Sequence, residues 1–216
     1  YKRQHMRNSL LIVLFIIKMG VSQHTYPADT LIFSDKSNFV EKAFILPISA
    51  WQRLSYNSNL LSCQFYPSCS NYGALAIHHY GVFFGTTITA DRIIRCNPFA
   101  LDYHYDIGGE FQYSDYRLID SLNIVNKIDK SNKSPLLAAG LSMIFPGAGR
   151  VYAGRLLDGL MGLWMISISG AATYSAFQEE KNIKGTFFSI VTLIFYTGEI
   201  YGAYRAAKYY QSPNNN

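Results

Sequence analysis

Two long apolar segments near the C-terminal end place the strongest constraint on how this chain can fold. They run from Leu156 to Phe177 and from Gly185 to Tyr204. Each holds about the 20 residues that a helix rising about 1.5 Å per residue needs to cross a hydrocarbon layer roughly 30 Å thick. The segments predict a membrane-spanning helical hairpin. The alternative is a buried hairpin of a soluble protein, which the absence of any charged residue from Leu160 to Gln178 disfavours.

Charged residues gather at one end of this predicted hairpin. Asp158 lies near the start of the first helix and Glu199 near the end of the second. An antiparallel arrangement places both acids at the same membrane surface, together with Arg150, Arg155, Arg205 and Lys208. The basic excess predicts that this surface is cytoplasmic. Small residues would let the two helices approach closely, namely Gly159, Gly162, Gly170, Ala171 and Ala172.

The composition agrees with a membrane-associated chain. Of the 216 residues, 49% are hydrophobic and 15% are charged, whereas about a quarter is usual for charged residues in soluble domains. The net charge of +5 and the pI of about 9.0 suit nucleic acid or the anionic face of a membrane. Because the apolar content favours the membrane, we expect anionic phospholipid and no nucleic acid as a partner.

The N-terminal segment, residues 1–23, has the pattern of a signal peptide. A short basic start precedes a strongly apolar run from Ser9 to Ile17, and Met6 is a candidate first residue. The run is shorter than the roughly 20 residues of a spanning helix. The alternative interpretation is an uncleaved N-terminal anchor.

A polar linker over residues 24–37 and a helix over residues 38–56 are predicted next. Asn38 followed by Glu41 is a capping pattern. Pro47 predicts a kink or a break of this helix. Apolar residues recur at helical spacing and suit either a membrane interface or ordinary core packing, and they are Val40, Phe44, Ile48, Trp51 and Leu54.

Two shorter helices are predicted between residues 63 and 98. Ser68 follows a proline and begins the first helix, which ends at Gly81. The second helix continues to about Arg95. Asp91 precedes Arg95 by four residues, the favourable spacing for an intrahelical ion pair.

The predicted organisation is therefore all-α. A small helical domain at residues 38–99 is followed by a polar, tyrosine-rich linker at residues 100–134, with one short strand or hairpin. A helical membrane segment at residues 135–210 begins with a short apolar stretch and ends with the hairpin.

Many residues between Cys63 and Phe99 occur at the spacing of a known family. They are Cys63, Phe65, Pro67, Ser68, Cys69, Ser70, Tyr72, Ala76, Ile77, Gly81, Gly85, Arg92, Arg95, Cys96 and Pro98. In these residues the chain resembles the YidD family of membrane protein insertion efficiency factors, over roughly residues 40–99. Two features depart from the family. Gln64 stands where an arginine is frequent, and the family's Gly-Gly-Tyr-Asp-Pro tail is not recognisable. A second stretch, Pro146 to Leu160, is similar to the entry of small two-helix membrane modules.

The resemblance implies a non-enzymatic helper at the bacterial inner (plasma) membrane. It would assist a YidC-type insertase or the Sec translocon in passing nascent membrane proteins into the bilayer. The alternatives are a scaffold that docks another envelope complex and a thiol- or metal-dependent enzyme. The sequence holds no nucleophile elbow, phosphate-binding loop or paired His-Glu metal motif, so we expect no catalytic residue and no cofactor. The family usually lies at the cytoplasmic face, which a signal peptide would contradict, so the side of the membrane stays open.

The arginine pair and the cysteines are the candidate binding residues. Arg92 and Arg95 carry forked donors that suit the phosphates of lipid headgroups or an acidic partner, or else form intramolecular ion pairs. The three cysteines form a disulfide in an exported domain, or remain reduced in a cytoplasmic one. They could instead bind a metal with His78, His79 or His104, but the five residues between Cys63 and Cys69 fit a zinc knuckle poorly. No metal site is therefore predicted.

Overall fold

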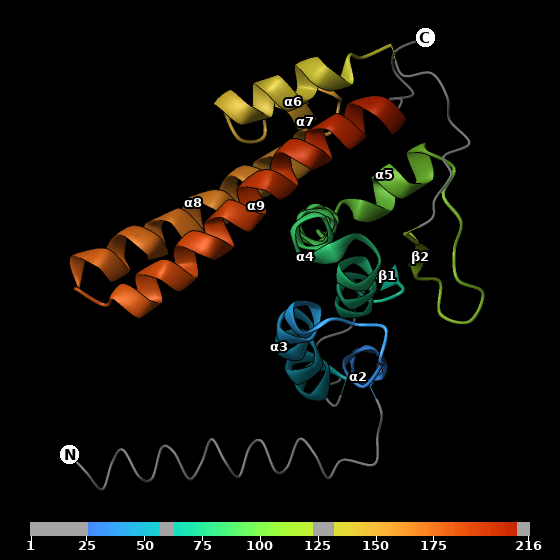
Figure 1. Ribbon diagram of the computed structural model, residues 1–216. Helices are drawn as coiled ribbons and strands as arrows, with labels where there is room; N and C mark the ends of the chain where they lie inside the picture. Colours follow the sequence, from blue (N-terminus) through green and yellow to red (C-terminus); the bar gives the residue numbers. More distant parts are fainter. Residues whose placement is uncertain (1–25, 57–62, 123–131, 211–216) are drawn as a thin grey trace, which may run out of the picture.

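The computed structural model describes residues 26–56, 63–122 and 132–210, and it confirms the predicted all-α class. Within these ranges there are eight helices, α2 to α9, and one pair of two-residue strands. Figure 1 shows two parts in contact, helices α2 to α5 with the strands, and helices α6 to α9. The predicted signal peptide at residues 1–23 lies outside the described residues.

The first part begins with helices α2 (Pro27–Ile32) and α3 (Phe39–Ser55). Helix α2 lies in the segment predicted to be a linker, and a buried carboxylate ties it to α3. Asp29 accepts a hydrogen bond from Ser49 Oγ at 2.6 Å and from Arg53 Nη1 at 3.0 Å. The predicted cap of α3 is confirmed, since the Asn38 side chain accepts from the Glu41 N–H at 2.8 Å.

Helix α3 continues through Pro47, so the predicted break does not occur. A proline removes one backbone donor, while the buried Ile45 and Gln52 hold the helix on both sides of it. Of the predicted apolar stripe, only Ile48 packs against the core formed with Ala28 and Ile77. The other four side chains are exposed, and they are Val40, Phe44, Trp51 and Leu54.

Helix α4 (Cys69–Arg95) bends at Gly81, as predicted from the glycine. Gly81 has φ 75° and ψ 173°, a conformation that residues with a side chain hardly adopt. After the bend, the second half returns to lie against the first. A Cβ atom at Gly85 would stand only 2.5 Å from the Cα of Ile77, so this close approach requires glycine at position 85.

The segment predicted as a polar linker contains a helix and a strand. Helix α5 spans Ala100–Asp106, and strand β2 (Leu118–Ile119) pairs in parallel with β1 (Phe65–Tyr66). The short strand was expected and the helix was not. Phe65, Ala100 and Leu118 form a buried cluster that holds this segment against the end of α4.

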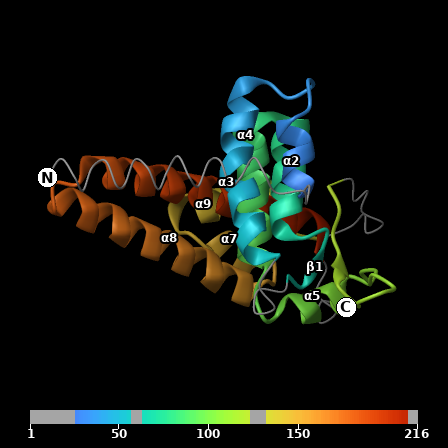
Figure 2. The same cartoon turned by 90° about the horizontal axis from the view of Figure 1, so that it is seen from below.

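The second part consists of α6 (Pro135–Ile144), α7 (Ala148–Tyr152), α8 (Leu156–Gln178) and α9 (Asn182–Tyr209). Helices α8 and α9 form a hairpin that projects away from the other helices (Figure 2). Both are long and apolar enough to cross a membrane, and only 22% and 17% of their most apolar stretches are buried. The core helix of a soluble protein would be mostly buried, so these values support a membrane hairpin.

Of three glycines predicted to let the hairpin helices approach closely, only one lies where α8 meets α9. A Cβ atom at Gly162 would collide with the Glu199 carboxylate of α9, so this glycine lets the two helices meet as predicted. Gly159 instead faces the backbone of Gly147 in the turn before α7. Gly170 has no such neighbour within 4 Å in the described part of the chain, so its predicted role in close approach is wrong.

Candidate functional site

Charged side chains meet where the two parts of the chain touch. Arg150 Nη2 lies 2.8 Å from Asp91 of α4, and its Nε lies 2.7 Å from Glu199 of α9. Asp91 also pairs with Arg95 at 3.0 Å, which confirms the predicted intrahelical pair, and with Arg205 at 3.3 Å. These contacts join α4, α7 and α9.

Asp120, after β2, extends this arrangement. Its carboxylate lies 2.8 Å from Arg95 and 3.2 Å from both Arg92 and Arg205. At the start of α8, Arg155 pairs with Asp158 at 2.6 Å. The ion-pair network, as we call it below, comprises seven side chains joined by these ion pairs and the neighbouring Arg155–Asp158 pair. The seven are Asp91, Arg92, Arg95, Asp120, Arg150, Glu199 and Arg205. The predicted gathering of Asp158, Glu199 and three arginines is thus seen, whereas Lys208 lies over the rings of Tyr204 and Tyr209.

The network is buried. Asp91, Arg92, Arg150, Asp158 and Glu199 are at most 1% exposed. Removing charges from water is costly, so such groups require close partners of opposite charge. Burial alone would raise the pKa of Asp91, but Arg95, Arg150 and Arg205 outweigh it and hold this pKa well below its usual value.

The Asp120 carboxyl is governed by the same balance. Its burial opposes ionisation, but Arg95, Arg205 and Arg92 lower its pKa well below the usual value. Both aspartates are therefore ionised at neutral pH. The network sets five guanidinium groups against four carboxyl groups.

Small residues on α9 let it reach this network. Gly198 and Gly202 are four residues apart, the spacing that allows close contact between membrane helices. A Cβ atom at Gly198 would lie 2.5 Å from the Ala90 Cβ of α4. One at Gly202 would collide with Arg150 and Asp91. The sequence therefore leaves room for a charged contact between α4 and α9.

Arg92 is held on all sides by the first part of the chain. Its guanidinium lies 4.4 Å from the ring centre of Phe65 and 4.3 Å from that of Tyr72. It donates hydrogen bonds to the carbonyl oxygens of Pro67, at 2.8 Å, and Asp120. Four family-motif residues thus pack together, and Arg92 holds β1 and the segment after β2 against α4.

A cavity of about 400 Å³ lies beside the network, between α5, the segment around β2 and the end of α9. Arg95, Arg155 and Arg205 line it together with tyrosines, and the acidic residues Asp91, Glu110 and Asp120 line it as well. Arg95 is 8% exposed, and its Nη2 has no hydrogen-bond partner in the described residues. The cavity is therefore lined by an arginine that has one guanidinium nitrogen without a partner among the described residues. Arg92 does not line it.

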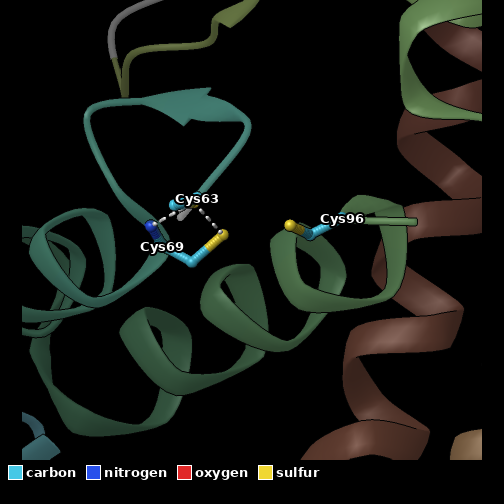
Figure 3. A group of neighbouring side chains, drawn as sticks. All are labelled: Cys63, Cys69 and Cys96. Carbon is cyan, nitrogen blue, oxygen red and sulfur yellow. Dashed lines mark hydrogen bonds between the residues drawn. The ribbon is translucent and has the colours of Figure 1, made fainter. Parts of the chain in front are cut away.

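The three cysteines also converge, as Figure 3 shows. Cys63 precedes β1, Cys69 begins α4 and Cys96 follows its end. A straight helix of this length would separate Cys69 from Cys96 by roughly 40 Å, but the bend at Gly81 brings them together. The sulfur atoms all lie within 4.8 Å of one another. No histidine in the described part of the chain joins them, so the considered three-cysteine, one-histidine set does not form.

Hydrogen bonds between the thiols shift the pKa values of Cys63 and Cys69 in opposite directions. The distance from Cys63 Sγ to Cys69 Sγ is 3.5 Å, and the Cys69 backbone N–H donates to Cys63 Sγ at 3.4 Å. Donation from Cys69 lowers the pKa of Cys63, and the same contact raises the pKa of Cys69. The three thiols are free, with no disulfide between them.

Two further family-motif residues, Ser70 and Pro98, lie at the two ends of α4. Ser70 Oγ accepts a hydrogen bond from Gln52 of α3 at 3.3 Å, and Pro98 follows the end of α4. Asp120 was missed because it lies in a segment interpreted as a linker. No local pattern marks it, since its partners are 25 or more residues away in the sequence.

Comparison with known proteins finds a family match for the first part of the chain. Residues 40–106 match the family YidD, described as "Putative membrane protein insertion efficiency factor". Proteins of that name include one from Exiguobacterium sp., 40% identical over 67 residues, which are 30% of this chain and 75% of that protein. Another, from Clostridium perfringens, is 40% identical over 60 residues, 28% of this chain and 87% of that protein.

A third protein of that name, from Anaeromyxobacter sp., is 37% identical over 60 residues, 28% of this chain and 81% of its own length. No solved structure matches the chain. The matched region holds the cysteine cluster, Arg92, Arg95 and Asp91, whereas Asp120, which pairs with both arginines, lies beyond it. Because the match covers most of each of these three relatives at 37–40% identity, the chain belongs to the YidD family.

Proposed function

We propose that this chain assists the insertion of integral membrane proteins into the bacterial inner membrane, beside a YidC-type insertase or the Sec translocon and without chemistry of its own. The name of its relatives supports a role in this process. The observation that carries the proposal is the ion-pair network. It fixes the YidD segment to a hairpin that is long and apolar enough to span a bilayer.

Helix α3 supplies the surface that we assign to the membrane interface. Its apolar side chains are open to the surroundings, with Trp51 52% and Leu54 62% exposed. Figures 1 and 2 show α3 on the side toward which the hairpin projects, with its axis across that direction. If the hairpin crosses the bilayer, α3 lies along its surface, where an exposed apolar stripe is buried among lipids.

The cavity beside Arg95 supplies a site for an anionic phospholipid headgroup. It opens next to the last turns of α9, close to the end of the hairpin. The Nη2 of Arg95 is a charged donor without a partner in the described residues, and charge-assisted hydrogen bonds to phosphate are stronger than neutral ones. A bound headgroup would anchor the YidD segment at the membrane surface.

Insertion assays with the full chain test this function. Inner-membrane vesicles lacking the chain are compared with vesicles that contain it, and the protease-protected fraction of a newly made multispanning protein is measured. The chain is expected to raise this fraction. The double variant Trp51→Gln, Leu54→Gln should lose most of the gain, because polar amides weaken contact with the interface.

Tyr113→Gln is the matched control, since Tyr113 is fully exposed and belongs to the segment between α5 and β2. This variant should behave as the unaltered chain. An unchanged protected fraction in the presence of the chain would contradict the function. Crosslinks from α3 to envelope machinery other than an insertase or translocon would instead favour a scaffold.

A further inference from the structure

None of the three cysteines lines the cavity or belongs to the exposed stripe of α3 that the proposed function uses. Cys63, Cys69 and Cys96 are each partly exposed, and they pack around the buried side chains of Phe65, Ala100 and Leu118. The chain has three cysteines in all, and the fold brings all three together from separate positions. A disulfide would use two of them and would leave the third unexplained.

The distances fit a single metal ion. Zinc binds thiolate sulfur at about 2.3 Å, so the sulfurs of a tetrahedral site stand roughly 3.8 Å apart. Here Cys63 and Cys69 have sulfurs 3.5 Å apart, and all three sulfurs lie within 4.8 Å. Small rotations of the side chains would bring the sulfurs to the coordination distance.

Neighbouring donors are placed as they would be around metal-bound thiolates. The Cys69 N–H donates to Cys63 Sγ at 3.4 Å, and Gln64 Nε2 donates to Cys96 Sγ at 3.7 Å. Gln64 is itself held by the carbonyl of Asn97 at 2.8 Å. Such outer hydrogen bonds orient the ligands of a metal and stabilise their charge.

The sequence spacing does not exclude such a site. The limit of two to four residues between ligands applies when one tight turn supplies both of them. In this chain the ligands come from the segment before β1, the start of α4 and the residue after α4. Their convergence depends on the bend at Gly81.

We propose that Cys63, Cys69 and Cys96 bind one thiophilic metal ion of the zinc type, with the fourth coordination position open to water or a ligand from outside. Thiolate ligands favour Zn²⁺ or Cu⁺ over Mg²⁺ or Ca²⁺. Binding converts three thiols to thiolates and releases their protons to solvent. The ion ties the segment before β1 to both ends of α4.

Metal titration of the full chain in detergent tests the proposal. The chain is reduced, freed of metal with a chelator and titrated with Zn²⁺, and with Co²⁺ for its thiolate charge-transfer absorption. We expect one ion per chain. Loss of an outer hydrogen bond typically weakens metal binding about 10- to 100-fold, so Cys63→Ser, Cys69→Ser and Cys96→Ser should each weaken it at least that much.

His79→Gln is the control, because His79 is exposed and lies outside the cluster. It should bind zinc as the unaltered chain does. A measurement that needs no variant is the rate of thiol alkylation, which zinc should slow at all three cysteines. Absence of zinc binding by the reduced chain would overturn the proposal. So would a disulfide between any two cysteines in the chain isolated without reductant, detected by mass after alkylation.

Discussion

Arg92 shows how one side chain can hold several segments together. Its planar guanidinium fits between the rings of Phe65 and Tyr72, and its N–H groups reach two carbonyl oxygens and the Asp120 carboxylate. Lysine has the same charge but neither the flat shape nor the forked donors. The residue is therefore required for its geometry as well as for its charge.

The variant Arg92→Lys should lower the free energy of unfolding by about 2–4 kcal/mol, because stacking and buried hydrogen bonds are lost together. Denaturant titration of the detergent-solubilised chain, followed by its helical circular dichroism, measures the change. Arg117→Lys is the matched control. Arg117 also lies over a tyrosine ring and pairs with an aspartate, but its side chain is 33% exposed. An equal effect of both variants would contradict the role given to Arg92.

Arg95 differs from Arg92 because Arg95 lines the cavity and Arg92 does not, although each has one buried guanidinium nitrogen without a hydrogen-bond partner in the described residues. Arg95→Gln should reduce the binding of anionic phosphatidylglycerol about tenfold, by removing one charge-assisted contact with phosphate. Native mass spectrometry of the chain in detergent counts the bound lipids. Arg117→Gln should retain them. Equal binding of phosphatidylcholine, or competition by inorganic phosphate alone, would show that the site does not select an anionic lipid.

At the level of elements, α4 and α9 depend on small side chains for their contact. Gly202→Ala places a methyl group against Arg150 and Asp91. Overpacking of this kind costs typically 1–3 kcal/mol, and we expect unfolding at correspondingly lower concentrations of sodium dodecyl sulfate. Gly170→Ala should be neutral or stabilising by about 0.5–1 kcal/mol, because the site is open and alanine favours helices. Similar losses for both would rule out the packing explanation.

The elements that were predictable from the sequence are those with a local signal. Apolar length predicts α8 and α9, Asn38 and Glu41 predict the start of α3, and Gly81 predicts the bend in α4. Helices α2 and α5 are short and depend on distant contacts, such as that of Asp29 with Ser49. The continuation of α3 through Pro47 was not predictable, because burial on both sides outweighs one lost hydrogen bond.

In the candidate site too, contacts with a local sequence signal were predictable and contacts between distant segments were not. Asp91 and Arg95 are one helical turn apart, so their contact could be predicted from spacing. The approach of Asp120 and Arg205 to them depends on how β2 and α9 pack against α4, which no local pattern encodes. The cysteine cluster was likewise unpredictable from ligand spacing, since it forms through the bend of a helix.

For the whole molecule, the network makes stability depend on pH in a defined direction. Asp91 and Asp120 have pKa values lowered below those of the unfolded chain. Their contribution is therefore complete above the unfolded value, about 4, and is lost as the pH falls below it toward the folded values. Each carboxyl group adds a slope of up to about 1.4 kcal/mol per pH unit in that range.

Thermal unfolding of the solubilised chain between pH 7 and pH 2.5 tests this dependence. The midpoint should change little down to about pH 4 and should fall steeply below it. Asp91→Asn, which cannot titrate at this position, should unfold at a lower temperature at pH 7 but with a shallower fall in acid. A steep loss between pH 7 and pH 5 would show that other groups control the transition.

The burial of Asp91 has a consequence for how the molecule is made. Two of its three partners, Arg150 and Arg205, come from the C-terminal third of the chain and are synthesised after it. Until α7 and α9 have been made and have packed against α4, Asp91 has only Arg95 of its own helix as an ionic partner. Completion of the buried ion pairs in the YidD segment thus depends on the folding of its own C-terminal hairpin, so that the hairpin completes a segment made before it.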